Sequence, residues 1–275
     1  MTPQASPALN LLLVGCGNMG RALLSGWLAH GMIAKTIIIE PTPHNIPQDN
    51  RLVLCVNATD IPSAFTPNIV VFAVKPQTLP DIAGYYAHYT GPDTLFLSIA
   101  AGKTIGFFEK HLGASAKIVR AMPNSPASIH AGITAACANA HITSNDRYKI
   151  GHLLQAVGDV VWVDDETLIN PVTALSGSGP AYVFLLIEAM TKAGIKSGLP
   201  AEMSEKLARA TVYGSGLLAR KEQATPAETL RKNVTSPNGT TAAALDILMR
   251  DKGGIQELFD EALAAATQRA QELEG

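Results

Sequence analysis

The chain has 275 residues, 47% of them hydrophobic and 16% charged, and its formal net charge is −2. This composition supplies enough apolar residues for one large core or two ordinary ones, and it excludes a wholly disordered chain. The chain lacks the excess of lysine and arginine that neutralises phosphate backbones, so we expect no nucleic-acid partner. Its three cysteines, Cys16, Cys55 and Cys137, have neither disulfide nor metal-ligand spacing, which favours a reducing, cytoplasmic compartment and no metal site.

The N-terminal end carries no targeting pattern. Residues 1–8 are polar and contain proline, so we expect a flexible tail. The apolar run that follows, residues 11–14, is far too short to span a bilayer and stops at a glycine. We therefore expect no membrane association.

Strands and helices alternate over the next 155 or so residues. Residues 9–14 predict a buried strand, residues 21–30 a helix that packs on a sheet, and residues 36–39 a β-branched second strand. Later apolar runs predict strands at residues 69–74, 94–99, 117–121 and 160–163. This order predicts a Rossmann-type, doubly wound, mainly parallel α/β sheet over residues 9–163, with ligands at the carboxyl ends of the strands.

The pattern changes after residue 163. The remaining segments have helical spacing with proline or glycine at their ends: residues 180–193, 200–220, 240–250 and 255–273. We expect residues 164–275 to form an all-helical domain. Because such a domain is small for an independent core and its helices are apolar on more than one face, we expect it to form a homodimer.

A glycine loop joins the first predicted strand to the first helix, Gly15-Cys16-Gly17-Asn18-Met19-Gly20. In this context it predicts a dinucleotide site, with the diphosphate at the helix N-terminus. Gly15 permits the tight turn, Gly17 lets the backbone approach the pyrophosphate, and Gly20 lets the helix pack closely. For Cys16 we favour a small side chain filling the turn over a thiol activated by the helix N-terminus.

Glu40 ends the second predicted strand. A carboxylate there can accept hydrogen bonds from both adenosine ribose hydroxyls and repels a 2′-phosphate, which favours NADH. No arginine occurs in residues 41–45 to receive that phosphate. The alternative is that Glu40 points to solvent.

Four further motifs follow in this order: Ala73-Val74-Lys75-Pro76, Arg120-Ala121-Met122-Pro123-Asn124, Leu175-Ser176-Gly177-Ser178-Gly179-Pro180-Ala181-Tyr182 and Val234-Thr235-Ser236-Pro237-Asn238-Gly239-Thr240-Thr241. Together with the glycine loop they resemble the pyrroline-5-carboxylate reductase family over nearly the whole chain. One departure is Asn238, where the family usually has a second glycine. Because asparagine tolerates a left-handed backbone, we expect the loop geometry to survive.

The resemblance implies reduction of the C=N bond of 1-pyrroline-5-carboxylate to L-proline, the last step of proline biosynthesis. It implies NAD(P)H as the hydride donor; the family suggests NADPH, whereas Glu40 favours NADH. It also implies a homodimer that can assemble into a larger ring. The expected cofactor contacts are Val14, Gly15, Cys16, Gly17, Asn18, Met19, Gly20, Glu40, Asn57, Ala73, Val74, Lys75, Pro76, Ile99, Ala100 and Ala101. The expected substrate contacts are Glu166, Asn233, Ser236, Gly239, Thr240 and Thr241.

Thr241 is the expected catalytic residue. Gly239 precedes a predicted helix, so the N–H groups of Gly239, Thr240 and their neighbours can receive the substrate carboxylate. The Thr241 hydroxyl can then hydrogen-bond the ring nitrogen as hydride reaches the adjacent carbon. The alternative is a threonine that satisfies the backbone at a helix start. Of the other charged residues, Lys75 either contacts the nicotinamide or shapes the backbone, and Arg120 is expected to hold the loop around Pro123 and Asn124.

Two other classes of protein share parts of this pattern. Hydroxyacid dehydrogenases and other imine reductases combine a nucleotide domain with a helical domain. A β-hydroxyacid dehydrogenase, however, carries a lysine one turn into the helix after its second glycine motif, whereas here no lysine follows the motif at residues 176–179 until Lys192. A non-catalytic NAD(P) sensor would bind the nucleotide without turnover, but it has no need for the carboxylate site at residues 235–241.

Overall fold

The computed structural model describes residues 8–274, and the chain divides into two compact units. The first unit contains the residues up to Gly177 and those from Ala266 onward, and the second is Ser178–Ala265. Contacts thus group residues 164–177 with the sheet, and the boundary at residue 164 stays a prediction. Of the predicted tail only Ala8 is described; it is exposed and directly precedes the first strand.

The first unit is built on one eight-stranded sheet with the order β3-β2-β1-β4-β5-β6-β7-β8. Its neighbouring strands are parallel except for the antiparallel pair β6 and β7. The strands are β1 (Leu9–Val14), β2 (Ile33–Ile39), β3 (Leu52–Cys55), β4 (Ile69–Phe72), β5 (Leu95–Ser98), β6 (Lys117–Pro123), β7 (Gly132–Ala138) and β8 (Gly158–Trp162). The doubly wound, mainly parallel α/β prediction is confirmed.

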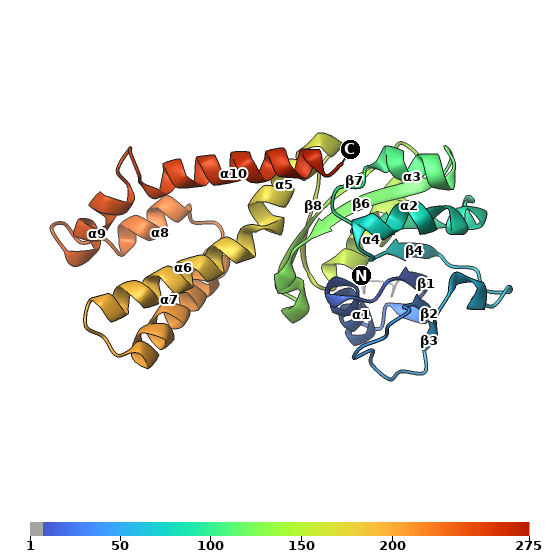
Figure 1. Ribbon diagram of the computed structural model, residues 1–275, viewed down its shortest axis with the longest axis horizontal. Coiled ribbons are helices and arrows are strands. Elements are labelled where there is room, and N and C mark those ends of the chain that lie inside the picture. Colours follow the sequence, from blue (N-terminus) through green and yellow to red (C-terminus); the bar gives the residue numbers. More distant parts are fainter. Residues whose placement is uncertain (1–7, 275) are drawn as a thin grey trace, which may run out of the picture. The chain divides into compact units, whose positions relative to one another are not determined.

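Helices cover both faces of this sheet (Figure 1). The helices of the first unit are α1 (Asn18–Ala29), α2 (Leu79–Ile82), α3 (Ile105–Leu112), α4 (Ser144–Gln155) and α5 (Ile169–Val172). Helix α5 continues through a π-helical segment, Thr173–Gly177, into the second unit.

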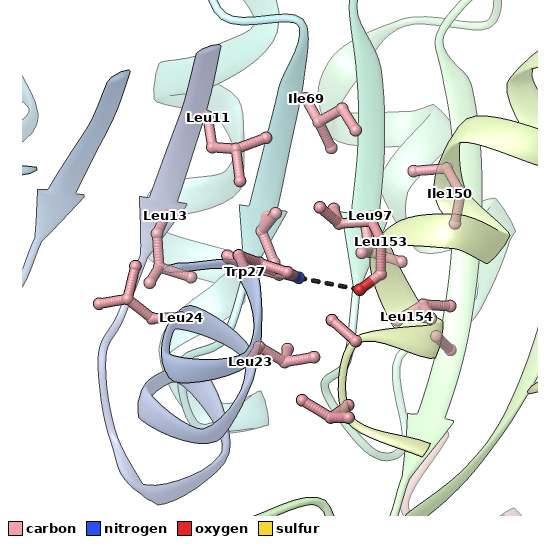
Figure 2. Close-up of a cluster of buried hydrophobic side chains, with 14 of the residues drawn as sticks. Leu11, Leu13, Leu23, Leu24, Trp27, Ile69, Leu97, Ile150, Leu153 and Leu154 are labelled. Atoms are coloured by element: carbon pink, nitrogen blue, oxygen red, sulfur yellow. Dashed lines mark hydrogen bonds between the residues drawn. The ribbon is translucent and has the colours of Figure 1, made fainter. Parts of the chain in front are cut away.

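Residues of β1 alternate between two hydrophobic clusters because successive side chains of a strand point to opposite faces. Leu11 and Leu13 belong to the cluster under α1 and α4, whereas Leu12 and Val14 belong to the cluster on the other face. In the first cluster Trp27 of α1 is fully buried, and its Nε1–H donates to the carbonyl oxygen of Leu153 in α4 at 2.9 Å (Figure 2). The core thereby fixes α1 against α4 and the sheet.

Asp146 fastens the start of α4 to β6. Its Oδ2 accepts hydrogen bonds from Thr143 Oγ1 at 2.8 Å and from Lys117 Nζ at 3.1 Å, and the carboxyl group is buried. Burial by itself raises the pKa of this carboxyl, but the bonds from Thr143 and Lys117 outweigh burial and hold the pKa below its ordinary value. Asp146 is therefore a charged, helix-capping contact within the core of the unit.

We expect Asp146→Asn to lower the free energy of unfolding by about 1–3 kcal/mol at neutral pH. A carboxyl whose pKa is depressed by folding stabilises fully above its unfolded-state pKa and loses that contribution as the pH falls through the lower folded-state pKa. The gap between wild type and variant in urea unfolding therefore closes as the pH falls below about 4. A gap that does not change with pH would show that shape, and not charge, carries the effect.

The second unit is entirely helical. It contains α6 (Gly179–Lys196), α7 (Ala201–Lys221), α8 (Ala227–Asn233), α9 (Thr240–Leu248) and the first part of α10 (Ile255–Glu272), whose end belongs to the first unit. Large apolar side chains of α6 are exposed, among them Phe184 and Leu185. Among the described residues, the helical stretch Glu166–Lys196 is long and apolar enough to cross a membrane, by length and composition alone; its mean hydropathy reaches 1.3, and its most apolar part is largely exposed.

Candidate active site

The three glycines of the loop between β1 and α1 are required for different reasons. Gly15 has a φ of +87°, and a Cβ there would lie 2.6 Å from Val74 Cγ1 and 2.8 Å from the Ala73 carbonyl oxygen. A Cβ on Gly20 would lie 2.9 Å from the Gly15 carbonyl oxygen, so this glycine lets α1 close onto the turn. A Cβ on Gly17 would meet no protein atom within 4 Å. The space in front of Gly17 is therefore open to a ligand, as a pyrophosphate site requires.

Cys16 is a structural residue of the loop. Its side chain is buried, and burial raises the pKa of the thiol to about 11, with Glu40 adding to the rise and Arg21 opposing it. The thiol is thus protonated at neutral pH. The interpretation as a small side chain filling the turn is confirmed, and activation by the helix N-terminus is wrong.

Glu40 follows β2 and binds the glycine loop. Its Oε2 accepts the Cys16 N–H at 2.8 Å, and its Oε1 accepts the Thr42 N–H at 3.2 Å and the Thr42 hydroxyl at 3.3 Å. The half-buried carboxylate therefore does not simply point to solvent. Three of the roughly four hydrogen bonds that a carboxylate accepts are thus taken, and the remaining acceptor capacity for a ribose hydroxyl lies on Oε2.

An arginine does lie beside the loop that follows Glu40, contrary to the expectation from sequence. Arg21, in the first turns of α1, donates from Nη1 to the carbonyl oxygen of His44 at 3.0 Å and from Nη2 to Asn18 Oδ1 at 2.6 Å. The expectation considered only residues 41–45 and missed the Arg21 side chain, which belongs to α1. This guanidinium is a candidate ligand for a 2′-phosphate.

The other expected cofactor residues gather at the carboxyl ends of neighbouring strands. The Glu40 N–H donates to the Cys55 carbonyl oxygen at 3.1 Å, which sets Asn57, two residues after β3, on the same edge as Glu40. The Ala73 N–H donates to Val14 and the Ile99 N–H to Phe72, at 2.7 and 3.1 Å. The Ala100 N–H donates to Ser98 Oγ at 3.2 Å. The structure thus brings residues 14–20, 40, 57, 73–76 and 99–101 to one edge of the sheet. Their contacts with the cofactor stay a prediction.

Lys75 shapes the backbone after β4. It precedes a 3₁₀ turn, Pro76–Thr78, and its carbonyl oxygen accepts the Thr78 N–H at 3.0 Å. Its side chain is exposed. Its contact with the nicotinamide stays a prediction, while the following proline fixes the turn.

The expected substrate residues fall in both units. Glu166 belongs to the first unit, where its Oε1 accepts the Ile105 N–H at 2.8 Å and pairs with Arg120 Nη1 at 2.9 Å. The remaining residues belong to the second unit: Asn233, Ser236, Gly239, Thr240 and Thr241. Asn233 is the last residue of α8, and Thr240 and Thr241 are the first residues of α9.

The segment before α9 is a tight turn with proline at its second position. The Gly239 N–H donates to the Ser236 carbonyl oxygen at 3.0 Å, and Asn238, at the third position, has a φ of +58°. A left-handed residue there is typical of a type II turn. Asn238 thus adopts the left-handed backbone that the expectation called for, and the likeness of the loop to that of the family stays a prediction. The expectation for Gly239 needs correction, because its N–H already has a partner and the free donors are those of the first residues of α9.

Arg120 does not hold the loop around Pro123 and Asn124. The guanidinium pairs with Glu166 and with Glu274 Oε1, the latter at 2.7 Å. The loop is instead held by Asn124 itself, whose Oδ1 accepts the Ile133 N–H at 2.9 Å and whose Nδ2 donates to the Ser176 carbonyl oxygen at 3.2 Å. Glu274 was missed, and no local signal marks it, because it lies at the end of an amphipathic helix among other glutamates.

Two family models match this chain, one in the sheet-containing unit and one mainly in the helical unit. Residues 166–273 match the family model for pyrroline-5-carboxylate reductase dimerisation, and residues 10–102 match the model for NADP oxidoreductase, coenzyme F420-dependent. A pyrroline-5-carboxylate reductase from Pseudomonas aeruginosa is 38% identical over 265 residues, which is 96% of this chain and 96% of that protein.

Solved structures give the same result. The structure of a pyrroline-5-carboxylate reductase from Coxiella burnetii is 34% identical, with a TM-score of 0.87 over 98% of this chain and 99% of that one. The Plasmodium falciparum pyrroline carboxylate reductase with NADP bound is 30% identical, with a TM-score of 0.82 over 97% of this chain and 98% of that one. The chain belongs to the pyrroline-5-carboxylate reductase family.

Proposed function

We propose that this chain reduces 1-pyrroline-5-carboxylate to L-proline with NAD(P)H. The observation that carries the proposal is the turn at residues 236–239, which presents the free N–H groups of α9 and the Thr240 and Thr241 hydroxyls. The turn provides a site for the substrate, and the dinucleotide-type glycine loop provides a site for the cofactor. Relatives of the chain are named pyrroline-5-carboxylate reductase, which also supports the proposal. When bound, the cofactor supplies the hydride.

The substrate is a cyclic imine that carries a carboxylate. The N–H groups of the first α9 residues receive the carboxylate, and the positive end of the helix contributes about 0.3–2 kcal/mol to its binding. The Thr241 hydroxyl hydrogen-bonds the ring nitrogen. As the C=N carbon gains hydride, the nitrogen takes up a proton from solvent, so that the double bond becomes a CH–NH single bond. The protein mainly orients the imine, and no strongly basic or acidic side chain is required.

The direct test is the loss of reduced-nicotinamide absorbance when purified protein is mixed with 1-pyrroline-5-carboxylate, with NADH and NADPH in parallel. Oxidation of either cofactor only in the presence of the imine supports the proposal. Binding of both nucleotides without turnover would support a nucleotide sensor instead. Turnover with a 2-hydroxyacid or β-hydroxyacid, and none with the imine, would support the dehydrogenase alternative.

Cofactor preference depends on two opposite charges, Glu40 and Arg21. We expect Arg21→Ala to lower the ratio of kcat/KM for NADPH to that for NADH by about tenfold to a hundredfold, the range of a lost charge-assisted hydrogen bond. We expect Glu40→Gln to raise the ratio, because it removes the charge but keeps an acceptor for the Cys16 N–H. The measurement is steady-state kinetics with both cofactors. An unchanged ratio in both variants would show that neither side chain reaches the ribose.

We further propose that the second unit forms a homodimer, which can assemble into a larger ring. The family model matched by residues 166–273 is a dimerisation domain, and the exposed apolar side chains of α6 need a cover. A second copy of this chain provides that cover, so we assign the apolar stretch to self-association and not to a membrane.

Cys16, Cys55 and Cys137 are free and buried, which favours a cytoplasmic location.

A further inference from the structure

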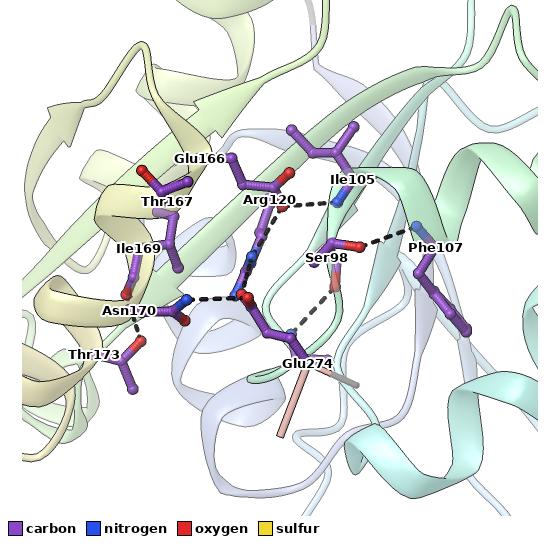
Figure 3. A network of polar contacts seen from close by, with 12 residues as sticks. Ser98, Ile105, Phe107, Arg120, Glu166, Thr167, Ile169, Asn170, Thr173 and Glu274 are labelled. Carbon is purple, nitrogen blue, oxygen red and sulfur yellow. Dashed lines mark hydrogen bonds and ion pairs between the residues drawn. The ribbon is translucent and has the colours of Figure 1, made fainter. Parts of the chain in front are cut away.

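A buried arginine in the middle of β6 is shared by two carboxylates from distant parts of the chain. Arg120 is 2% exposed, and a single nitrogen, Nη1, lies 2.9 Å from Glu166 Oε1 and 2.7 Å from Glu274 Oε1 (Figure 3). The two carboxylate oxygens are therefore near neighbours. The position of one carboxylate constrains the position of the other.

Both carboxylates have a second partner. Glu166 Oε1 accepts the N–H of Ile105, the first residue of α3, at 2.8 Å. Glu274 Oε2 accepts a hydrogen bond from Nδ2 of Asn170, a buried residue of α5, at 3.0 Å. The network thus joins β6, α3, α5, the 3₁₀ turn that contains Glu166, and the C-terminal end of the chain.

The residue before Glu274 lies against a loop at the expected cofactor edge. Gly102 has a φ of +68°, and a Cβ there would lie 2.7 Å from the Leu273 carbonyl oxygen and 3.1 Å from Leu273 Cβ. Gly102 directly follows residues 99–101, which are expected to line the path to the nicotinamide. The C-terminal segment therefore contacts this loop and the arginine that holds Glu166.

The charge of the network indicates a role beyond neutralising Arg120. A buried guanidinium needs a paired carboxylate, and Glu166 alone meets that need. Glu274 adds a second negative charge at a half-buried position, with 22% of its side chain exposed. Nη1 carries two N–H groups and can donate one to each carboxylate, but the two carboxylates share one positive charge, so Glu274 weakens the net electrostatic attraction between Arg120 and Glu166.

We propose that Glu274 is a positioning residue for the reaction. By sharing Arg120 it leaves Glu166 with hydrogen-bonding capacity for the substrate, and through Leu273 it supports the loop at residues 100–102. This inference rests on the proposed function, in which Glu166 contacts the imine or proline.

The test compares Glu274→Gln with the control Glu272→Gln. The Glu274→Gln change retains the size of the side chain and one acceptor oxygen but removes the second negative charge beside Arg120, so that Arg120 attracts Glu166 more strongly. Glu272 is exposed and forms an ion pair with Arg269 of the same helix at 2.7 Å, outside the network around Arg120. We expect Glu274→Gln to raise the KM for the imine about threefold to tenfold, with kcat, the KM for NAD(P)H and the Tm close to wild type. The control variant should match wild type in all four.

A double-mutant cycle with Glu166→Gln separates positioning from a structural role. If Glu274 acts through Glu166, then Glu274→Gln has no further effect on the imine KM once Glu166 has been replaced by glutamine. Independent, additive effects would overturn the proposal, and so would a lowered Tm with an unchanged imine KM. Wild-type turnover of the imine is measured in the same series, so absence of turnover would reject the proposed function, whereas turnover with additive effects would reject the role of Glu274 alone.

Discussion

Replacing Gly17 by alanine is expected to raise the Kd for NAD(P)H about tenfold to a hundredfold while leaving the stability of the protein unchanged. The new Cβ would meet no protein atom within 4 Å, so the folded chain has room for it. The same space is where the backbone must approach the pyrophosphate, and overpacking there costs about 1–3 kcal/mol. Fluorescence titration with NADPH and thermal unfolding of the same samples measure the two effects.

Gly15→Ala is the matched contrast, because it should destabilise the folded protein itself and not only weaken cofactor binding. The methyl group would lie 2.6 Å from Val74 Cγ1 and 2.8 Å from the Ala73 carbonyl oxygen, at a φ of +87°. Strain and overlap together should lower the free energy of unfolding by about 2–4 kcal/mol. Gly31→Ala provides the control, since Gly31 has a φ of +64° but an unobstructed Cβ position. A Gly17 variant that binds NADPH as well as wild type would remove this loop from the cofactor site.

The elements predicted best from the sequence are those whose conformation is determined by neighbouring residues in the chain. The glycine loop follows from β1, the turn and α1, which are consecutive in the chain. The left-handed Asn238 follows from proline and glycine on either side of it. By contrast, β7 was not predicted because its sequence is rich in alanine, which is a poor strand former. This segment is a strand because it pairs with β6. The four-residue β3 is too short to give a pattern.

The side chains that sequence reasoning misplaced are those whose partners come from elsewhere in the fold. Arg21 reaches His44, which lies 23 residues later, only because α1 runs beside the loop after β2. Arg120 reads as a loop anchor next to Pro123 and Asn124, yet its partners are Glu166 and Glu274. Tertiary packing determines which charged side chains pair, and no periodic pattern in a single sequence predicts these pairs.

The second large effect concerns the hydroxyl of Thr241. We expect Thr241→Ala to lower kcat/KM for the imine about tenfold to a hundredfold, a loss of about 1–3 kcal/mol, because the ring nitrogen loses a hydrogen-bond partner as it becomes an amine. Thr241 is exposed and is the second residue of α9, where alanine is a good helix former. The variant should therefore fold normally, and steady-state kinetics with the imine varied at saturating cofactor measure the effect.

Thr241→Ser distinguishes the hydroxyl from the methyl group. Serine retains the donor and acceptor at the same position of the first helical turn, so it should recover most of the activity that alanine loses. If the carboxylate is held by the N–H groups of α9, then the alanine variant should still bind proline, because those donors belong to the backbone. Kinetics of Thr241→Ala equal to wild type would exclude the hydroxyl from the mechanism. Equal losses in the alanine and serine variants would instead assign the effect to the methyl group, which shapes the pocket without touching the nitrogen.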